Sequence, residues 1–134
     1  MEKISRELLM REVSSRLPYG VKAQVLGWDE NKQEEVYLPL RVYSINTDGY
    51  VYFESNDFDV NYCSIEECLL YLRPMSSMTE EEREEYKHLV AFSGNPEGSS
   101  NFIDWLNKNM FDYRGLIEKG LAIEVTKENN PYKE

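Results

Sequence analysis

The stretch "VKAQVLGWDENKQEEVYLPLRV", residues 21–42, decides the fold because its apolar residues recur at every second position. A period of two places all members of such a set on one face of a β-strand. The acidic loop "DENKQEE" separates the two halves, so the stretch predicts two strands joined by a turn. Pro39 has no N–H to donate, which predicts an edge position or a bulge in the second strand. The two alternating sets are Val21, Ala23 and Val25, then Val36, Leu38, Leu40 and Val42.

The period of two continues toward the C-terminus. The sequence "NTDG", residues 46–49, is typical of a hairpin turn. Val51 and Phe53 alternate after it, and a polar "SND" turn then leads to Phe58, Val60 and Tyr62. Together with the first two strands, these segments predict a meander of about four antiparallel strands.

Toward the N-terminus, residues 2–17 predict an amphipathic helix that ends at Pro18 and Gly20. Its apolar residues recur three and four positions apart. Three Glu–Arg pairs stand four residues apart in the favourable order, which predicts a salt-bridged face toward solvent. The apolar set is Ile4, Leu8, Leu9, Val13 and Leu17, and the pairs are Glu2 with Arg6, Glu7 with Arg11, and Glu12 with Arg16.

The second half of the sequence predicts helices. Ser64 with Glu67 forms a capping-box pattern before "IEECLLYL", residues 65–72, and Thr79 with Glu82 forms another before a helix that begins with "EEEREE". We expect a loop over "SGNPEGSS", residues 93–100. Ser99 or Ser100 would then cap a third helix, whose buried face would be Phe102, Ile103, Leu106 and Met110.

The stretch "MFDYRGLIEKGLAIEV", residues 110–125, predicts a helix end, a tight turn and one short helix over 113–119 that Gly120 closes. "LAIEV" then returns as a strand. The fold class we expect is α+β: an N-terminal helix, a small antiparallel meander or partly open barrel of about four to five strands, and helices of the second half packed on one side. Residues 1–126 would form the single domain, and 127–134 a frayed tail.

Composition and charge limit the function classes. The chain of 134 residues carries a net charge of −10, and residues 29–85 hold four basic against fifteen acidic side chains, a net −11. Such an acidic segment repels phosphates, so we expect no direct nucleic-acid binding and, as a partner, an unknown protein that is basic. No apolar run reaches the ~18 residues of a membrane span, and the N-terminal residues lack a signal-peptide pattern. These features predict a cytoplasmic protein without membrane contact.

No catalytic, metal or cofactor motif stands out. Cys63 and Cys68 are too far apart in sequence for a common zinc site, and His88 is the chain's one histidine. If Ser64 begins a helix, the two cysteines occupy the positions of a hydrophobic staple. The alternative is a plain buried thiol pair. We therefore expect no metal, no cofactor and no catalytic residues.

Four residues are candidates for a protein-binding site. Asp112, Tyr113 and Arg114 lack an obvious structural task in the stretch 110–125, and Trp105 lies about two helical turns earlier. Arginine and aromatic side chains are enriched at the energetic centres of protein interfaces. The structural alternative is that Arg114 binds carbonyls at a helix end or a carboxylate, and that Trp105 belongs to the core.

Three stretches carry a resemblance. "YLRPMSSMTEEE" (71–82) and "WLNKNMFDYRGLIEKGLAIE" (105–124) resemble segments shared by a family of short uncharacterised proteins from Bacteroidetes genomes and their phages. "LPYGVK" (17–22) is similar to that family's opening of the first strand. The resemblance covers most of the chain and implies a bacterial, cytoplasmic protein of prophage or mobile-element origin. It implies no activity and no functional residues.

Three functions follow as hypotheses. The first is a non-enzymatic protein-binding module of a mobile element. The second is an acidic nucleic-acid mimic that inhibits a DNA-binding host protein through residues 29–85. The third is a small enzyme that uses carboxylates in a cleft.

Overall fold

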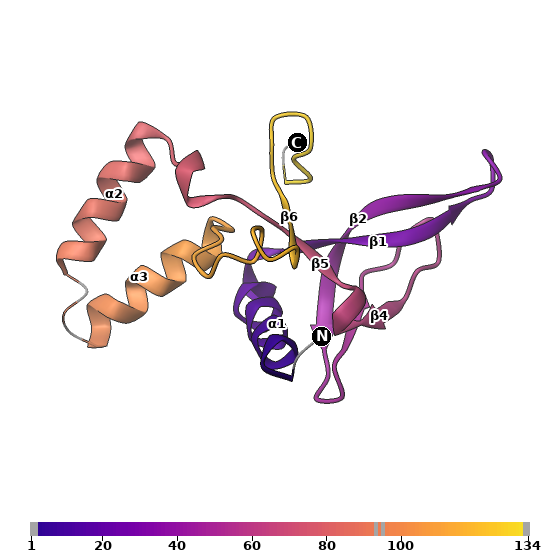
Figure 1. Cartoon of the computed structure of the whole chain (residues 1–134), viewed down its shortest axis with the longest axis horizontal. Coiled ribbons are helices and arrows are strands. Elements are labelled where there is room, and N and C mark those ends of the chain that lie inside the picture. The colour runs from indigo at the N-terminus through magenta and orange to yellow at the C-terminus, as the bar shows by residue number, and fades with distance from the viewer. Residues whose placement is uncertain (1–2, 93, 95, 133–134) are drawn as a thin grey trace.

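The computed structural model describes residues 3–92, 94 and 96–132, which form an α+β fold (Figure 1). A six-stranded sheet curls into half a barrel behind an N-terminal helix, and a pair of helices follows in the second half. In chain order the elements are α1 (Lys3–Arg16), β1 (Lys22–Asp29), β2 (Glu34–Ile45), β3 (Tyr50–Phe53), β4 (Tyr62–Ser64), β5 (Leu69–Leu72), α2 (Glu80–Ala91), α3 (Pro96–Lys108) and β6 (Ala122–Glu124). Short 3-10 turns occupy Leu17–Tyr19, Ile65–Glu67 and Met75–Ser77.

The strand order in the sheet is β4-β3-β2-β1-β5-β6. The first four strands are the predicted antiparallel meander, which is confirmed. Gly49, at φ 87°, closes the "NTDG" hairpin, and its N–H donates to the Asn46 carbonyl oxygen at 3.1 Å. Of the residues expected to alternate after the "SND" turn, only Tyr62 lies in a strand, since Phe58 and Val60 belong to the preceding loop.

The apolar sets of the alternating strands meet one side of α1 in the core. Leu9 and Val13 of α1 are buried, and so are Val21, Ala23 and Val25 before and within β1. The helix predicted over residues 2–17 is therefore confirmed over Lys3–Arg16, and the predicted burial is confirmed for Leu9 and Val13. Burial of such side chains is the main source of folding free energy.

Pro39 is tolerated because its missing N–H points away from β1. The Val42 N–H donates to the Val21 carbonyl oxygen at 3.0 Å, so these two residues are a hydrogen-bonded pair of the antiparallel ladder. From this pair onward, every second residue pair of β1 and β2 is hydrogen-bonded. The pair Gln24–Pro39 falls between them, and β3 pairs only with β2 residues beyond Arg41. The predicted edge position is confirmed for this half of β2.

The helix predicted over residues 65–72 is wrong. Ile65–Glu67 makes one 3-10 turn, and the following residues form β5, antiparallel to β1 and parallel to β6. Leu70, Tyr71 and Leu72 are all buried, and burial of consecutive side chains is typical of a strand inside a covered sheet. The Ser64 hydroxyl donates to the Glu67 carboxylate at 3.0 Å instead of capping a helix.

Two further expectations about the second half are wrong. The loop expected over 93–100 is shorter, because α3 already begins at Pro96, and Ser99 and Ser100 lie inside that helix instead of capping it. Proline suits the first turn of a helix, where its missing N–H costs no bond. Residues 113–119 form turns instead of a helix, although Gly120 does adopt the expected left-handed φ of 74°.

The helices α2 and α3 lie together at the end of the molecule opposite the β1–β2 hairpin (Figure 1). The capping box of Thr79 and Glu82 is confirmed in both of its hydrogen bonds. The ring of Tyr86 on α2 lies 5.6 Å from that of Phe102 and 6.4 Å from that of Trp105 on α3. None of the helices within the described ranges has the length and apolarity that a bilayer span requires.

Tyr132 anchors the end of the described chain on the sheet, inside the segment expected to be a frayed tail. Its hydroxyl donates to the Tyr71 carbonyl oxygen at 2.8 Å and accepts from the Lys22 N–H at 3.0 Å. Burial raises the pKa of Tyr132 far above its ordinary value. The Lys22 ammonium also donates to the Pro131 carbonyl oxygen at 2.8 Å.

Candidate functional site

The candidate residue Asp112 organises the turn that follows it. Its carboxylate is buried and accepts from the backbone N–H groups of Leu116 at 2.8 Å and Ile117 at 3.0 Å. The Asp112 N–H donates to the Arg73 carbonyl oxygen at 2.8 Å, next to the bridge that joins Arg73 and Phe111. All these bonds hold the chain between α3 and β6.

Tyr113 and Arg114 contact a polar cluster on α1 in which Glu12 and Arg16 are fully buried, while Tyr113 is half-buried and Arg114 stays exposed. Arg114 Nε donates to Glu12 Oε2 at 3.2 Å, and the other oxygen of Glu12 lies 3.4 Å from Arg16. The guanidinium carbons of Arg16 and Arg114 lie 5.3 and 5.4 Å from the centre of the Tyr113 ring. The Tyr113 hydroxyl donates to the side-chain oxygen of Asn107 at 2.9 Å.

The predicted solvent-facing salt bridges of α1 are therefore wrong for Glu12 and Arg16. Both side chains have no exposed surface, and Arg16 also donates to the Phe111 carbonyl oxygen at 2.7 Å. Arg6 pairs with Glu66, beyond its own helix, and Glu2 lies outside the described residues. A buried ion pair needs additional hydrogen bonds because desolvation of the charges is costly.

The remaining candidate, Trp105, lies apart from this cluster. Its indole N–H donates to the Glu85 carboxylate at 3.1 Å, and its ring is 5.5 Å from that of Phe111. The structure thus brings Tyr113 and Arg114 together with Glu12 and Arg16, and it gives Trp105 partners on α2. A role of the four residues in protein binding stays a prediction.

Three hollows on the described surface differ in their chemistry. One, between α2 and α3, is lined by Glu84, Glu85 and His88, but Glu85 already binds Trp105 and Glu84 lies 3.7 Å from Lys87. The lining of a second includes the basic side chains of Arg73, Lys108 and Lys127. The third lies between two strand edges and combines tyrosines with unpaired backbone groups.

This third hollow, of about 640 Å³, is named the seam here. It lies between residues 24–26 of β1 and β4, and is completed by Glu67 and Leu69, which follow β4 in the chain. Strand β5 pairs with β1 only at Ala23 and Gln24. The chain before β5 makes the 3-10 turn at Ile65–Glu67, and the strand before that turn, β4, pairs with β3 and not with β1. The half-barrel is therefore open on this side.

One wall of the seam presents the free edge of β1. The bonded pairs of β1 and β2 fall on Val25 and Gly27, so the backbone N–H and C=O groups of Leu26 and Trp28 point away from β2. Neither residue has a backbone hydrogen-bond partner on that side within the described part of the chain. A row of such groups is a template for another strand.

The opposite wall presents the free edge of β4. The Ile65 N–H donates to the Gly49 carbonyl oxygen at 2.8 Å and the Phe53 N–H to that of Asn61 at 3.0 Å, so odd-numbered residues face β3. The backbone groups of Tyr62 and Ser64 point the other way. Among residues 3–92, 94 and 96–132 no backbone bond to either of them is found on the outer side.

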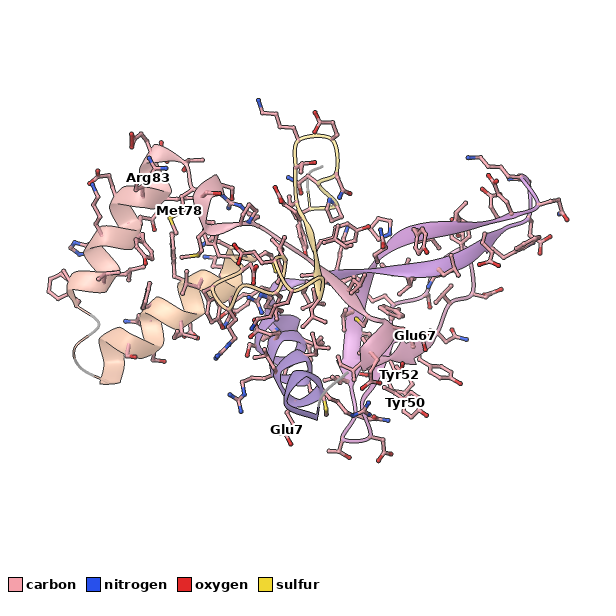
Figure 2. All side chains as sticks on the ribbon, in the orientation of Figure 1. Glu7, Tyr50, Tyr52, Glu67, Met78 and Arg83 are labelled. Atoms are coloured by element: carbon pink, nitrogen blue, oxygen red, sulfur yellow. The ribbon has the colours of Figure 1, made fainter. Side chains whose placement is uncertain are left out.

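Tyrosine rings flank the seam. Tyr37, Tyr50 and Tyr62 line it, and they expose 68, 42 and 58% of their surface. The rings of Tyr50 and Tyr62 meet edge to face with centroids 5.7 Å apart. Figure 2 shows Tyr50 and Tyr52 near Glu67, beside β4. Aromatic side chains on a rigid strand offer large contact area at little cost in conformational entropy.

The two cysteines meet at the inner end of the seam. Cys63 lines it from β4, and Cys68 is buried behind it. A hydrogen bond from the Cys68 thiol lowers the pKa of Cys63, against the opposing effects of burial and of Glu67. The same bond and burial raise the pKa of Cys68. The predicted buried thiol pair is confirmed for Cys68 alone, because Cys63 is only half-buried. Only a single 3-10 turn follows Ser64, so the two cysteines do not form the staple of an α-helix.

Sequence reasoning missed the seam because the helix predicted over 65–72 concealed β5 and the interrupted pairing along β1. The signal available in the sequence was the presence of two large apolar residues, Leu26 and Trp28, at the positions that alternate with the set Val21, Ala23 and Val25. Comparison with known proteins gives no match to a protein-family model, to a curated protein or to a solved structure. Within the described residues no group of three or more acidic, histidine or cysteine side chains is placed to hold a metal ion.

Proposed function

We propose that this chain is a non-enzymatic protein-binding module that takes up an extended segment of a partner protein in the seam. The single observation that supports this most is that two free strand edges line the same hollow, at Leu26 on β1 and at Tyr62 and Ser64 on β4. The free edge of β1 continues beyond the hollow to Trp28. An added strand forms main-chain hydrogen bonds, and pockets for alternate side chains supply specificity.

The chemistry around the seam favours a basic partner. Glu67 is the one charged residue among those that line the seam, and Glu34 and Glu35 lie at the start of β2. These residues belong to the segment 29–85, which carries a net charge of −11. A peptide with a central run of apolar and β-branched residues and with lysine or arginine at its ends would complement both the tyrosines and this charge.

The origin and location of the module are part of the proposal. The resemblance of residues 71–82 and 105–124 to the short proteins of Bacteroidetes genomes and their phages supports a bacterial prophage or mobile element as the source. A host or phage protein in the cytoplasm would then be the partner. Neither the nucleic-acid mimic nor the carboxylate enzyme is favoured by a comparable geometric feature.

The experiment is a selection of random 12-residue peptides displayed on phage against the whole chain, followed by affinity measurement of the selected peptides. We expect sequences with alternating apolar residues and basic ends, and binding that weakens as salt rises. The decisive variant is Leu26→Pro, because it deletes an N–H on the free edge and leaves the β1–β2 bonds intact. Pro39 occupies an equivalent non-bonded position in the natural sequence.

The matched control is Glu35→Pro, which occupies a non-bonded position of β2 opposite Trp28 and does not line the seam. We expect Leu26→Pro to weaken the selected peptides at least tenfold and Glu35→Pro to leave their affinity unchanged. If Leu26→Pro unfolds the chain, Ser64→Pro on β4 takes its place. Equal binding to all variants, or a selection that yields no peptide, would refute the proposal.

A further inference from the structure

The largest of the three hollows lies on another part of the molecule and has the opposite charge. It measures about 870 Å³ and is formed where the end of β5, the end of α3 and the residues after β6 come together. Three cationic side chains line it, Arg73, Lys108 and Lys127, and none of its lining residues is acidic. The whole chain has 25 acidic and 15 basic residues, so a hollow lined by basic and no acidic side chains differs in sign from the overall charge.

The three cationic side chains differ in whether they have an ion-pair partner. Arg73 is held in place, because Glu82 accepts from both of its terminal nitrogens at 2.8 and 2.7 Å and its guanidinium lies 4.3 Å from the centre of the Phe111 ring. Lys108 and Lys127 have no ion-pair partner within the described ranges of the chain. The hollow therefore carries two positive charges that the described protein groups do not compensate.

The other lining groups provide polar and apolar contacts beside these charges. The side-chain amides of Asn109 and Asn130 and the hydroxyl of Thr126 offer hydrogen bonds, and Tyr19 and Val125 offer apolar surface. The hydrogen bonds of Tyr132 to the sheet fix this residue in the wall of the hollow. A volume near 870 Å³ is within the range of small-molecule sites and far exceeds that of a bare inorganic anion.

We infer that this hollow is a binding site for a small phosphorylated organic molecule, independent of the seam. A phosphomonoester carries close to two negative charges at pH 7, which matches the two uncompensated lysines. Its oxygens accept hydrogen bonds from lysine ammonium and amide groups, and its organic part would contact Tyr19 and Val125. A nucleic-acid polymer is disfavoured because it would extend from the hollow across the acidic surface of the chain.

The test uses isothermal titration of the whole chain with pairs of probes that differ only in the phosphate. The pairs are AMP with adenosine, glucose 6-phosphate with glucose, and glycerol 3-phosphate with glycerol, and inorganic phosphate is titrated alone. We expect at least one phosphomonoester to bind with a Kd below about 1 mM, and its neutral counterpart to bind at least tenfold more weakly. Binding should also weaken below pH 6, where the phosphate loses its second charge.

Two variants locate the site. Lys108→Gln and Lys127→Gln should each lower the affinity of the bound probe at least fivefold, because each removes one of the two uncompensated charges. Lys119→Gln, an exposed lysine that does not line the hollow, is the control and should have no effect. The inference is overturned if no phosphomonoester binds, if inorganic phosphate binds as well as every ester, or if Lys119→Gln weakens binding as much as the other two. None of these results depends on peptide binding in the seam.

Discussion

Replacement of Glu12 by leucine tests whether the polar cluster on α1 is a structural element. The change removes the carboxylate that lies 3.4 Å from Arg16, and both side chains have no exposed surface. At an effective dielectric constant of 20, two charges about 4 Å apart attract by about 4 kcal/mol. The relief of Glu12 desolvation offsets part of this loss, so we expect the free energy of unfolding to fall by about 3 kcal/mol.

The double variant Glu12→Leu with Arg16→Met separates two effects: the loss of the Glu12–Arg16 attraction, and the cost of leaving the buried Arg16 charge without its partner. It removes the arginine that the single change leaves uncompensated, and it leaves the Phe111 carbonyl oxygen without its 2.7 Å hydrogen bond. That orphaned acceptor costs about 1–2 kcal/mol. We therefore expect the double variant to be more stable than Glu12→Leu alone, although less stable than the natural chain.

The assay is urea unfolding followed by circular dichroism for the natural chain and each variant. Glu7→Leu on the same helix is the control, because Glu7 is exposed and points away from the body of the protein (Figure 2). Its replacement should change the free energy of unfolding by less than about 0.5 kcal/mol. The reasoning is refuted if Glu12→Leu costs less than about 1 kcal/mol, or if the double variant is less stable than Glu12→Leu.

Three further predictions concern titratable groups. Cys63 should react with iodoacetamide at a lower pH than an ordinary thiol, and Cys68→Ala should raise that pH by removing the hydrogen bond; an unchanged pH–rate profile would contradict this. The pKa of Glu82 is lowered to about 2, chiefly by its hydrogen bond with Arg73, so its stabilisation is present above the unfolded pKa near 4.5 and is lost as pH falls toward 2. When the free energy of unfolding is measured against pH, the natural chain should be about 1–2 kcal/mol more stable than Glu82→Gln at pH 6, and the two should be nearly equally stable at pH 2. The same difference at every pH would disprove the role of the ion pair. Asp112→Asn should lower the free energy of unfolding by about 1–3 kcal/mol in urea unfolding, since a carboxylate that accepts two backbone N–H bonds is lost, and a neutral effect would contradict it.

The part of the fold that local patterns determine was predictable. The period of two in β1 and β2, the "NTDG" turn and the capping box at Thr79 all depend on neighbouring residues, and the structure contains each of them. The apolar periodicity of α1 likewise predicted the burial of Leu9 and Val13.

Features that depend on distant partners were not predictable from these patterns. Residues 69–72 contain an apolar run that fits a buried strand as well as a helix, and only pairing with β1 and β6 decides between them. The spacing of Glu12 and Arg16 fits an exposed pair, but contact with Arg114 and Phe111, about 100 residues later, places them in the interior. The two free edges of the seam follow from the same long-range pairing.

The central claim, that the seam presents two free strand edges for an added strand, is tested most directly by residue-resolved amide hydrogen exchange. In the free protein we predict fast exchange at Leu26, Trp28 and Ser64, and slow exchange at their neighbours Gly27 and Cys63, whose N–H groups face β2 and β3. Addition of a selected peptide should protect the first three residues. Slow exchange at Leu26 and Ser64 in the free protein, or unchanged exchange at both when the peptide is bound, would contradict the account.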